Sequence, residues 1–280
     1  MSKEIQPMSD QPSTEQDYTM GYSEEFLQLL HRRSAATHAA HLLPHLKPGQ
    51  RVLDFGCGPG TISMGLATAV APGELHGIDL EDSQINMARA AAKAGGHDNA
   101  TFHVGDVSDL PFGDDSFDVA HCHAVLMHVP DTEATLAEVK RVLKPGGIIS
   151  SREFILGSSF LEPGAEETAP AWETFGSLLA ANGGHPQMGR ELKRKFLEAG
   201  FTDVRATASF DFFGATEDVA FFHAFIMAWF YSPEVIAAAT KFGLATQEQF
   251  DEWREGLDEW KNHPGAVGAI GFGEAIATKP

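Results

Sequence analysis

The sequence predicts an α/β protein built on a mostly parallel sheet of seven strands with helices on both faces. Short apolar runs alternate with helical stretches from about residue 51 to 155, the pattern of parallel strands joined by helices. The first run, RVLDF (51–55), is typical of a strand buried on both faces. With 280 residues, 43% of them hydrophobic and 21% charged, the chain has the size and composition of a large globular domain.

Seven runs carry the strand signal, a short apolar or alternating segment between turn residues. In chain order they are RVLDF (51–55), ELHGIDL (74–80), ATFHVGD (100–106), FDVAHCH (117–123), GIISSREF (147–154), VRATASFDF (204–212) and AVGAIGFGEAIAT (266–278). About 50 residues separate the last two runs, which is more than a connecting loop needs. We therefore expect a helical lid inserted before the last strand.

Caps, prolines and glycines mark the helix boundaries. Helices are expected over 61–70 and 83–94, from the cap Asp131 to Leu143, and over 190–199. The third ends at Lys144-Pro-Gly-Gly147 and the fourth at Gly200. Two further helices start at Ser232-Pro233-Glu234 and at a capping box of Thr246 and Gln249. The polar tail over residues 1–17 is predicted to be disordered and residues 18–280 to form one domain. Within it, residues 47–155 form the core, and residues 157–188 and 212–264 are predicted to be insertions that cover a substrate.

Charge and cysteine content narrow the possible functions. The chain has 20 Lys and Arg against 39 Asp and Glu, a formal charge of −19, which disfavours nucleic acids and anionic membrane surfaces as partners. No apolar stretch approaches the roughly 18 residues of a membrane span. Cys57 and Cys122 give no disulfide framework, and the start of the chain has no secretory signal. We therefore expect a cytoplasmic monomer or homodimer that acts on a small molecule.

A glycine-rich turn, VLDFGCGPG (52–60), follows the first strand and precedes the first helix. Its glycines allow positive φ and the close approach of a ligand, and a helix N-terminus offers free N–H groups. The spacing G-x-G-x-G differs from the G-x-G-x-x-G of nicotinamide-binding turns, which opposes an oxidoreductase. Taken alone, the turn could also be a tight connection without a ligand.

The next two strands each end at an acid. Asp79 follows Gly60 by 19 residues, a position from which a carboxylate can accept hydrogen bonds from both hydroxyls of a ribose. The third strand ends in Gly105-Asp106-Val107, where a carboxylate could hold an exocyclic amine. Each acid alone could merely cap a helix. Together with the glycine turn, in this order on consecutive strands, they indicate a bound ligand.

These motifs resemble those of the class I S-adenosylmethionine-dependent methyltransferases, more narrowly the ubiquinone/menaquinone-biosynthesis type. The resemblance covers about residues 47–155 and includes VLDFGCGPG, the acid of GIDL, the GD of HVGDVSDLPF, the segment FDVAHCHAVLMHV and the helix end VLKPGG. It implies a Rossmann-like fold, S-adenosylmethionine as cofactor, and in-line attack of an acceptor's lone pair on the sulfonium methyl group.

The resemblance also implies which residues hold the cofactor. The glycine turn would line the methionine part, Asp79 would hold the ribose, and Asp106 with the backbone of Val107 would hold the adenine. Tyr22 and Arg33 are the candidates for the methionine carboxylate, although Arg33 could equally be a solvated residue on a helix face. The full predicted cofactor set is Tyr22, Arg33, Asp54, Gly56, Cys57, Gly58, Gly60, Asp79, Leu80, Gly105, Asp106, Val107 and His121.

Three histidines, His121, His123 and His128, lie at or just after the end of the fourth strand. An H-x-H pair with a third histidine could supply three nitrogens to a metal. The cofactor brings its own electrophile, however, and the pattern resembles family members that need no metal, so none is expected. His123 and His128 are the candidate catalytic residues, as a general base or a substrate contact, although a buried structural role would also explain each of them.

Nine aromatic residues lie among the 22 residues from Phe210 to Tyr231. Such a lid suits a small, largely apolar methyl acceptor, although any one ring could instead belong to the core of the lid. The candidate substrate-binding residues are Trp172, Met188, Phe222, His223 and Trp229.

The acceptor atom decides how much catalysis the protein must supply. A thiol with a pKa of about 8.5 is partly ionised at neutral pH and needs no strong base, whereas an aliphatic hydroxyl needs one, with His123, His128 or His223 as candidates. The overall plan looks similar to methyltransferases of specialised metabolism, one group of which S-methylates the dithiols of epidithiodiketopiperazines such as gliotoxin. We therefore rank S-methylation of a thiol or dithiol ahead of O- or C-methylation of a phenolic, enolic or quinone-like metabolite. A regulatory protein that binds the cofactor without methylating is the alternative of another class.

Overall fold

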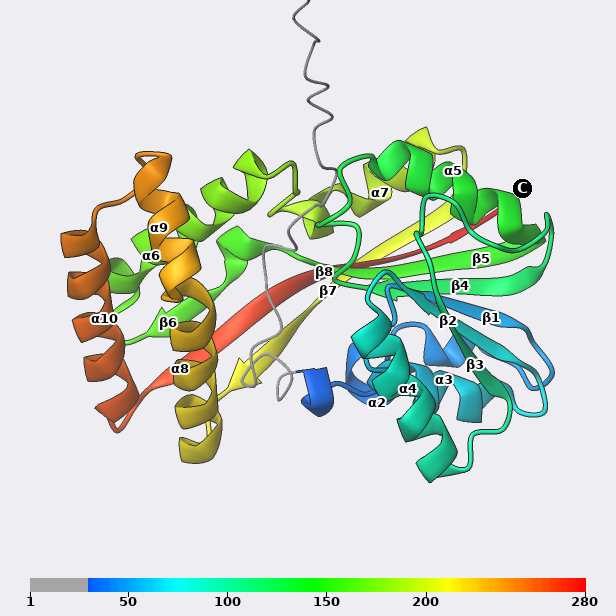
Figure 1. The fold of residues 1–280 in the computed structure, drawn as a ribbon, viewed down its shortest axis with the longest axis horizontal. Coiled ribbons are helices and arrows are strands. Elements are labelled where there is room, and N and C mark those ends of the chain that lie inside the picture. The colour runs from blue at the N-terminus through cyan, green and yellow to red at the C-terminus, as the bar shows by residue number, and fades with distance from the viewer. Residues whose placement is uncertain (1–29) are drawn as a thin grey trace, which may run out of the picture.

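The computed structural model describes residues 30–280, apart from the side chains of residues 165–168. The strands of this part are β1 (Val52–Phe55), β2 (Leu75–Asp79), β3 (Ala100–Val104), β4 (Phe117–His123), β5 (Leu143–Phe154), β6 (Phe160–Glu162), β7 (Thr202–Phe213) and β8 (Val267–Thr278). They form one eight-stranded sheet in the order β3-β2-β1-β4-β5-β8-β6, and β7 pairs with β8 as well (Figure 1). Only the pairs that involve β8 are antiparallel.

Helices cover both faces of the sheet. The α-helices of the described part are α2 (Ala35–His38), α3 (Thr61–Val70), α4 (Asp82–Gly95), α5 (Thr132–Val142), α6 (Ala165–Ala181), α7 (Met188–Glu198), α8 (Thr216–Phe230), α9 (Pro233–Lys241) and α10 (Gln247–Asn262), and short 3-10 turns cover Leu43–His45 and Leu156–Ser158. Figure 1 shows α5 and α7 on one face and α2, α3 and α4 on the other. The predicted Rossmann-like fold, mostly parallel with helices on both faces, is confirmed, with β6 as one strand more than predicted.

Local signals placed several elements correctly. The Asp131 side chain accepts a hydrogen bond from the Ala134 N–H at the start of α5. The Thr246 and Gln249 capping box is present at the start of α10. The main difference lies in α6, a helix of 17 residues within a segment predicted only as an insertion. Pro170 lies inside this helix, and proline in a sequence argues against a helix.

The helices α6, α8, α9 and α10 pack against one another at one end of the sheet, and we call them the lid (Figure 1). They come from the two segments that the sequence predicts to be insertions. Aromatic rings fill the space between them: Phe222 stacks on Phe213 with ring centroids 4.1 Å apart, and Trp229 packs on Phe225 and Phe230 at 4.8 and 5.0 Å. These buried rings belong to the same hydrophobic cluster as side chains of the sheet, so the lid extends the core.

Within residues 30–280, no single helix is long and apolar enough to span a membrane. Only α8 and α9 taken together, with a bend of 48° between them, reach that length and composition.

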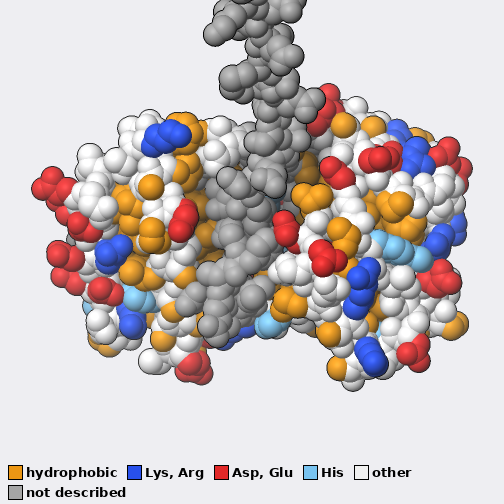
Figure 2. Space-filling view, viewed as in Figure 1, with side chains coloured by type: hydrophobic (Ala, Val, Ile, Leu, Met, Phe, Trp, Pro, Cys, Tyr) orange, Lys and Arg blue, Asp and Glu red, His pale blue; other side chains and the backbone are white. Residues whose placement is uncertain are grey.

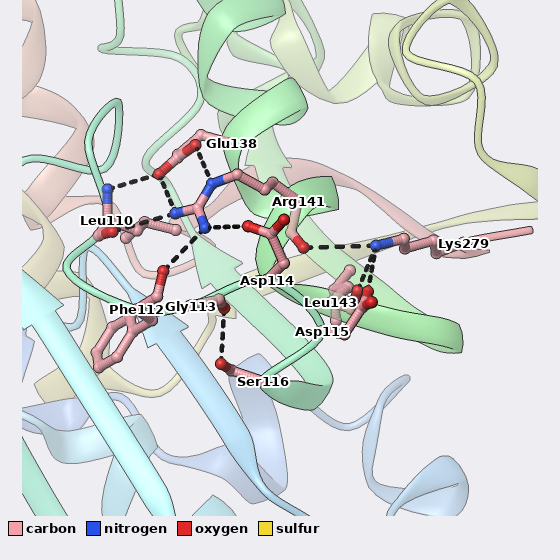
Figure 3. Close-up of polar contacts among 10 residues, drawn as sticks. All are labelled: Leu110, Phe112, Gly113, Asp114, Asp115, Ser116, Glu138, Arg141, Leu143 and Lys279. Atoms are coloured by element: carbon pink, nitrogen blue, oxygen red, sulfur yellow. Dashed lines mark hydrogen bonds and ion pairs between the residues drawn. The ribbon is translucent and has the colours of Figure 1, made fainter.

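Polar contacts stabilise the end of the sheet where β4 and β5 begin, opposite the predicted cofactor site (Figure 3). Arg141 pairs with Glu138 at 2.6 Å and with Asp114 at 2.7 Å. Lys279, which directly follows β8, pairs with Asp115 at 2.8 Å and donates a hydrogen bond to the Leu143 carbonyl. These bonds hold the segment that leads from β3 to β4. Figure 2 shows Lys and Arg side chains scattered singly over the visible face rather than gathered in a patch.

Candidate active site

Two adjoining cavities open at the carboxyl ends of the parallel strands. The smaller has a volume of about 70 Å³ and the larger about 320 Å³. Gly56, Asp79 and Ala124 line both of them, so the two cavities are direct neighbours. Open parallel sheets bind ligands at this edge because the loops between strands and helices diverge there. The larger cavity has the size of a small-molecule site.

The glycine turn forms the floor of the site. Gly56 and Gly58 have positive φ angles of 68° and 52°. A Cβ on Gly56 would lie 2.3 Å from a methyl carbon of Val125, so a side chain at this position would push Val125 away. The strand-to-helix turn can therefore pass this close to the loop after β4 only because residue 56 is glycine.

Asp79 joins the turn to the second strand. Its carboxylate accepts hydrogen bonds from the Gly58 N–H at 2.8 Å and from the Glu81 N–H at 3.1 Å. Burial raises the pKa of Asp79, while these two N–H groups act against the rise. The carboxylate lines both cavities, where its remaining lone pairs can accept hydrogen bonds from a ligand.

Asp54 lies deeper, in the floor of the smaller cavity. It is buried on β1 and accepts a hydrogen bond from the Ser63 hydroxyl. Burial raises its pKa to about 7; the Ser63 hydroxyl opposes this rise and the nearby charge of Asp79 adds to it. A cationic group that enters the smaller cavity would favour the ionised form of Asp54.

The larger cavity continues along the loop after β3. Leu80, Gly105, Asp106 and Val107 line it. The Asp106 carboxylate accepts hydrogen bonds from the backbone N–H and the hydroxyl of Ser108, both at 2.8 Å. These bonds fix the loop and leave the second carboxylate oxygen for a ligand.

His123 is at the end of β4 and lines the smaller cavity. Its side chain is buried, and neither ring nitrogen has a hydrogen-bond partner within the described part of the chain. Burial lowers the pKa of His123 well below its usual range, and the positive charges of Arg33 and Arg152 lower it further. The ring is therefore neutral at physiological pH. Its edge packs on His38, with ring centroids 5.2 Å apart.

His128 lines the larger cavity, on the loop that leads to α5. Burial and the charge of Arg33 lower the pKa of His128 to about 4, so it too is neutral. Arg33 and Cys57 lie at the smaller cavity, as the sequence predicts for the cofactor set.

Two members of the predicted cofactor set do not line either cavity. The His121 ring is fully buried behind the site and lies 3.2 Å from the Ser150 hydroxyl. Gly60 is the N-cap of α3 and faces Ala88 and Met64. Tyr22 lies outside the described residues.

The predicted substrate residues lie away from both cavities. Phe222 and Trp229 are in the aromatic core of the lid, and Met188 is fully buried at the start of α7. His223 pairs with Asp258 of α10 at 2.7 Å. Trp172 lines a separate groove beside α6. Trp172, Phe222, His223 and Trp229 belong to the lid helices, whereas Met188 belongs to α7. Their predicted contact with an acceptor stays a prediction.

Several cavity residues carry no signal in the sequence. Leu179, in the last turn of α6, and Asn182 and Gly184, in the segment that follows the helix, line the larger cavity, so this end of the lid forms part of its wall. Gln84, buried on the first turn of α4, lines the smaller one. The sequence does not reveal that Gln84 is buried, because its burial depends on how α4 packs against the sheet. Among the side chains that the structure describes, no group of three or more His, Cys, Asp or Glu is arranged to hold a metal ion.

Residues 46–199 match the sequence model of a methyltransferase domain family. An uncharacterised methyltransferase of Schizosaccharomyces pombe is 31% identical over 205 residues, which cover 70% of this chain and 73% of that protein. A probable methyltransferase of Aspergillus luteorubrus is 35% identical over 148 residues, 50% of this chain and 52% of that protein, so the chain spans about half the length of this second relative.

Solved structures share the fold at low identity. The YcgJ protein of Bacillus subtilis superimposes with a TM-score of 0.61 at 18% identity, covering 88% of this chain and 99% of that one. Phosphoethanolamine N-methyltransferase 2 of Haemonchus contortus, solved in complex with S-adenosyl-L-methionine, has a TM-score of 0.53 at 20% identity and covers 84% of this chain and 49% of that one.

Proposed function

Because the chain belongs to the class I S-adenosylmethionine-dependent methyltransferases, we propose that it methylates a small, largely apolar metabolite at a thiol or dithiol sulfur. Gliotoxin-type dithiols of specialised metabolism are an example of such acceptors. Binding of the cofactor is supported above all by the two adjoining cavities that the glycine turn, Asp79 and Asp106 line.

The residues present fit S-adenosylmethionine. The larger cavity of about 320 Å³ has room for a nucleoside, with Asp79 for the ribose hydroxyls and Asp106 with the Val107 backbone for the adenine. The smaller cavity offers Asp54 for an ammonium group and Arg33 for a carboxylate. Gly56 and Gly58 line the smaller cavity, and glycine at these positions lets a ligand come close to the backbone.

When bound, S-adenosylmethionine supplies a methyl group on a positively charged sulfur. The chain's own residues then have to place the acceptor and exclude water. Ala124 and Gly56, which line both cavities, mark the junction between the nucleoside and amino-acid parts of the site. His123 lines the smaller cavity next to Ala124. In this proposal the acceptor reaches the methyl group beside the His123 ring.

His123 supports a thiol as the acceptor. Burial and two nearby arginines hold the pKa of His123 well below its usual range, so the imidazole stays neutral but is a weak base. A weak base cannot remove the proton of an aliphatic hydroxyl, whereas a thiol with a pKa of about 8.5 is partly ionised near neutral pH without a base. The neutral ring also avoids a second positive charge next to a sulfonium. A phenolic, enolic or quinone-like acceptor is acidic enough to be the second candidate.

The proposal includes a cytoplasmic location, because Cys57 and Cys122 are unbonded and buried, as in proteins of a reducing compartment. It includes no nucleic-acid or membrane partner, in keeping with the formal charge of −19.

Matched acceptor pairs test the proposal. The full chain is incubated with trideuteromethyl-labelled S-adenosylmethionine and either ortho-benzenedithiol or catechol, and either benzyl mercaptan or benzyl alcohol, and products are read by mass spectrometry. Labelled thioethers without labelled ethers support S-methylation. Faster labelling of catechol than of the dithiol would overturn the thiol assignment in favour of O-methylation. Cofactor binding without any labelled product would favour a binding protein.

A further inference from the structure

Glu153 is a buried carboxylate that the proposed reaction does not use. It lies near the end of β5 and has no exposed surface. Its strand neighbour Arg152 is paired with His123 in the β4–β5 register, and successive side chains of a strand point to opposite faces. Glu153 therefore lies on the other face of the sheet from His123, toward the loop that leaves β4.

Backbone N–H groups of that loop surround the carboxylate. One oxygen accepts hydrogen bonds from the N–H groups of Val125 and Leu126, both at 3.0 Å. The other accepts from the N–H of Met127 at 3.2 Å. The Ser151 hydroxyl donates to the first oxygen at 3.2 Å, and the Cys122 thiol does so at 3.7 Å.

This arrangement is unusual for a buried acid. Within residues 30–280, Glu153 makes no ion pair, so hydrogen bonds alone offset the loss of water around it. Burial raises the pKa of Glu153, and the three backbone N–H groups oppose this rise. A carboxylate in such a place stabilises the conformation of the peptide groups that donate to it, because those N–H groups would otherwise be buried without acceptors.

The loop that Glu153 holds is a wall of the cofactor site. Ala124, at its start, has a positive φ of 55°, a conformation that a residue other than glycine adopts at a cost. Val125 fills the space beside Gly56, and His128 lines the larger cavity. The Met127 carbonyl accepts a hydrogen bond from the His185 N–H at 2.7 Å, which ties the same loop to the segment after α6.

We propose that Glu153 is a positioning residue for cofactor binding: it holds the 125–127 peptide groups so that Val125 and His128 form the wall opposite the glycine turn. The proposal rests on the proposed function, because it assumes that the site binds S-adenosylmethionine or its product. Glu153 itself touches no part of the two cavities.

Glu153→Gln is the test variant. The amide keeps the size of the side chain but has only one oxygen, so at least one of the loop N–H groups faces an NH₂ donor. We expect the dissociation constant for S-adenosylhomocysteine, measured by calorimetry, to rise about tenfold, which corresponds to about 1.4 kcal/mol. We expect faster amide hydrogen exchange in the peptide that contains residues 124–131.

Asp118→Asn is the matched control. Asp118 also accepts a backbone N–H, that of Arg51 at 2.8 Å, and it pairs with Lys144 at 2.7 Å. It lies at the start of β4, at the opposite end of the strand from the site. Its substitution should lower the melting temperature without changing S-adenosylhomocysteine affinity or exchange in the 124–131 peptide. The control thus separates loss of stability from loss of positioning.

The outcomes are distinguishable. Wild-type affinity and unchanged loop exchange in a folded Glu153→Gln variant would overturn the role of Glu153. If that variant does not fold, exchange in the wild-type chain decides: the amides of residues 125–127 are expected to exchange more slowly than that of Val129, and equal rates would overturn the role. A wild-type chain that does not bind S-adenosylhomocysteine would instead contradict the proposed function.

Discussion

The carboxylate of Asp79 accepts a hydrogen bond from the backbone N–H of Gly58 at 2.8 Å, so the acid at the end of β2 fastens the glycine turn that follows β1. One residue therefore has two tasks: it shapes the turn and offers its remaining lone pairs to the cavity. This link explains how two motifs on different strands form a single site.

Asp79→Ala should weaken S-adenosylmethionine binding at least tenfold, or about 1.4 kcal/mol, because it removes the acceptor for the ribose and loosens the turn. Asp79→Asn should lose less, since its amide oxygen can still accept from the Gly58 N–H. Calorimetric titration of both variants measures the difference. Unchanged affinity in Asp79→Ala would rule out the ribose assignment.

Cofactor affinity should depend on pH through Asp54. Burial raises the pKa of Asp54 to about 7, so the free protein is mostly protonated at this site below that pH. If the ionised carboxylate binds the ammonium group of the ligand, binding releases a proton. Affinity for S-adenosylhomocysteine should then rise about tenfold from roughly pH 6 to pH 8 and level off above. Asp54→Asn should bind with little pH dependence; an equally steep dependence in this variant would assign the titration to another group.

His123→Ala should lower turnover of ortho-benzenedithiol more than it lowers S-adenosylhomocysteine affinity, because the proposed function places the acceptor beside this ring, which lines the smaller cavity. In the wild type, the rate should increase with pH toward the pKa of the thiol. The rate should show no additional pH dependence near the ordinary histidine pKa of about 6.5, since the pKa of His123 is well below it. A pH–rate profile of both proteins checks this, and wild-type turnover in His123→Ala would make the residue structural.

Phe222→Ala should destabilise the fold by about 3–5 kcal/mol, because the ring is fully buried and stacks on Phe213 at 4.1 Å. Phe242, with 52% of its surface exposed, is the control, and Phe242→Ala should stay within about 0.5 kcal/mol of the wild type. Urea unfolding measures both. A Phe222→Ala variant as stable as the wild type would mean that the lid is not packed as a core.

Features that local interactions determine were predictable from the sequence. The cap at Asp131 and the box of Thr246 and Gln249 each involve residues close in the chain, so their spacing alone identifies them. The glycine turn and Asp79 were predictable because strand ends in a parallel sheet meet at one edge.

Features that depend on packing were not predictable. The sequence pattern of an aromatic residue in a lid is the same whether its ring faces a cavity or the core. Phe222 and Trp229 lie in the core. Glu153 gives no signal at all, because its partners are backbone N–H groups of residues that are distant in sequence. The contribution of Asn182 to the larger cavity depends on how α6 is placed against the loop after β4.

The most direct test of the account is a single-turnover reaction of the full chain with trideuteromethyl-labelled S-adenosylmethionine and ortho-benzenedithiol, followed by mass spectrometry. We expect S-adenosylhomocysteine and the S-methylated dithiol to form in equal amounts, and Asp79→Ala at the same cofactor concentration to form at least several-fold less of both. A chain that binds S-adenosylhomocysteine in a calorimeter but transfers no labelled methyl group to this dithiol, to catechol or to either benzyl acceptor would contradict it.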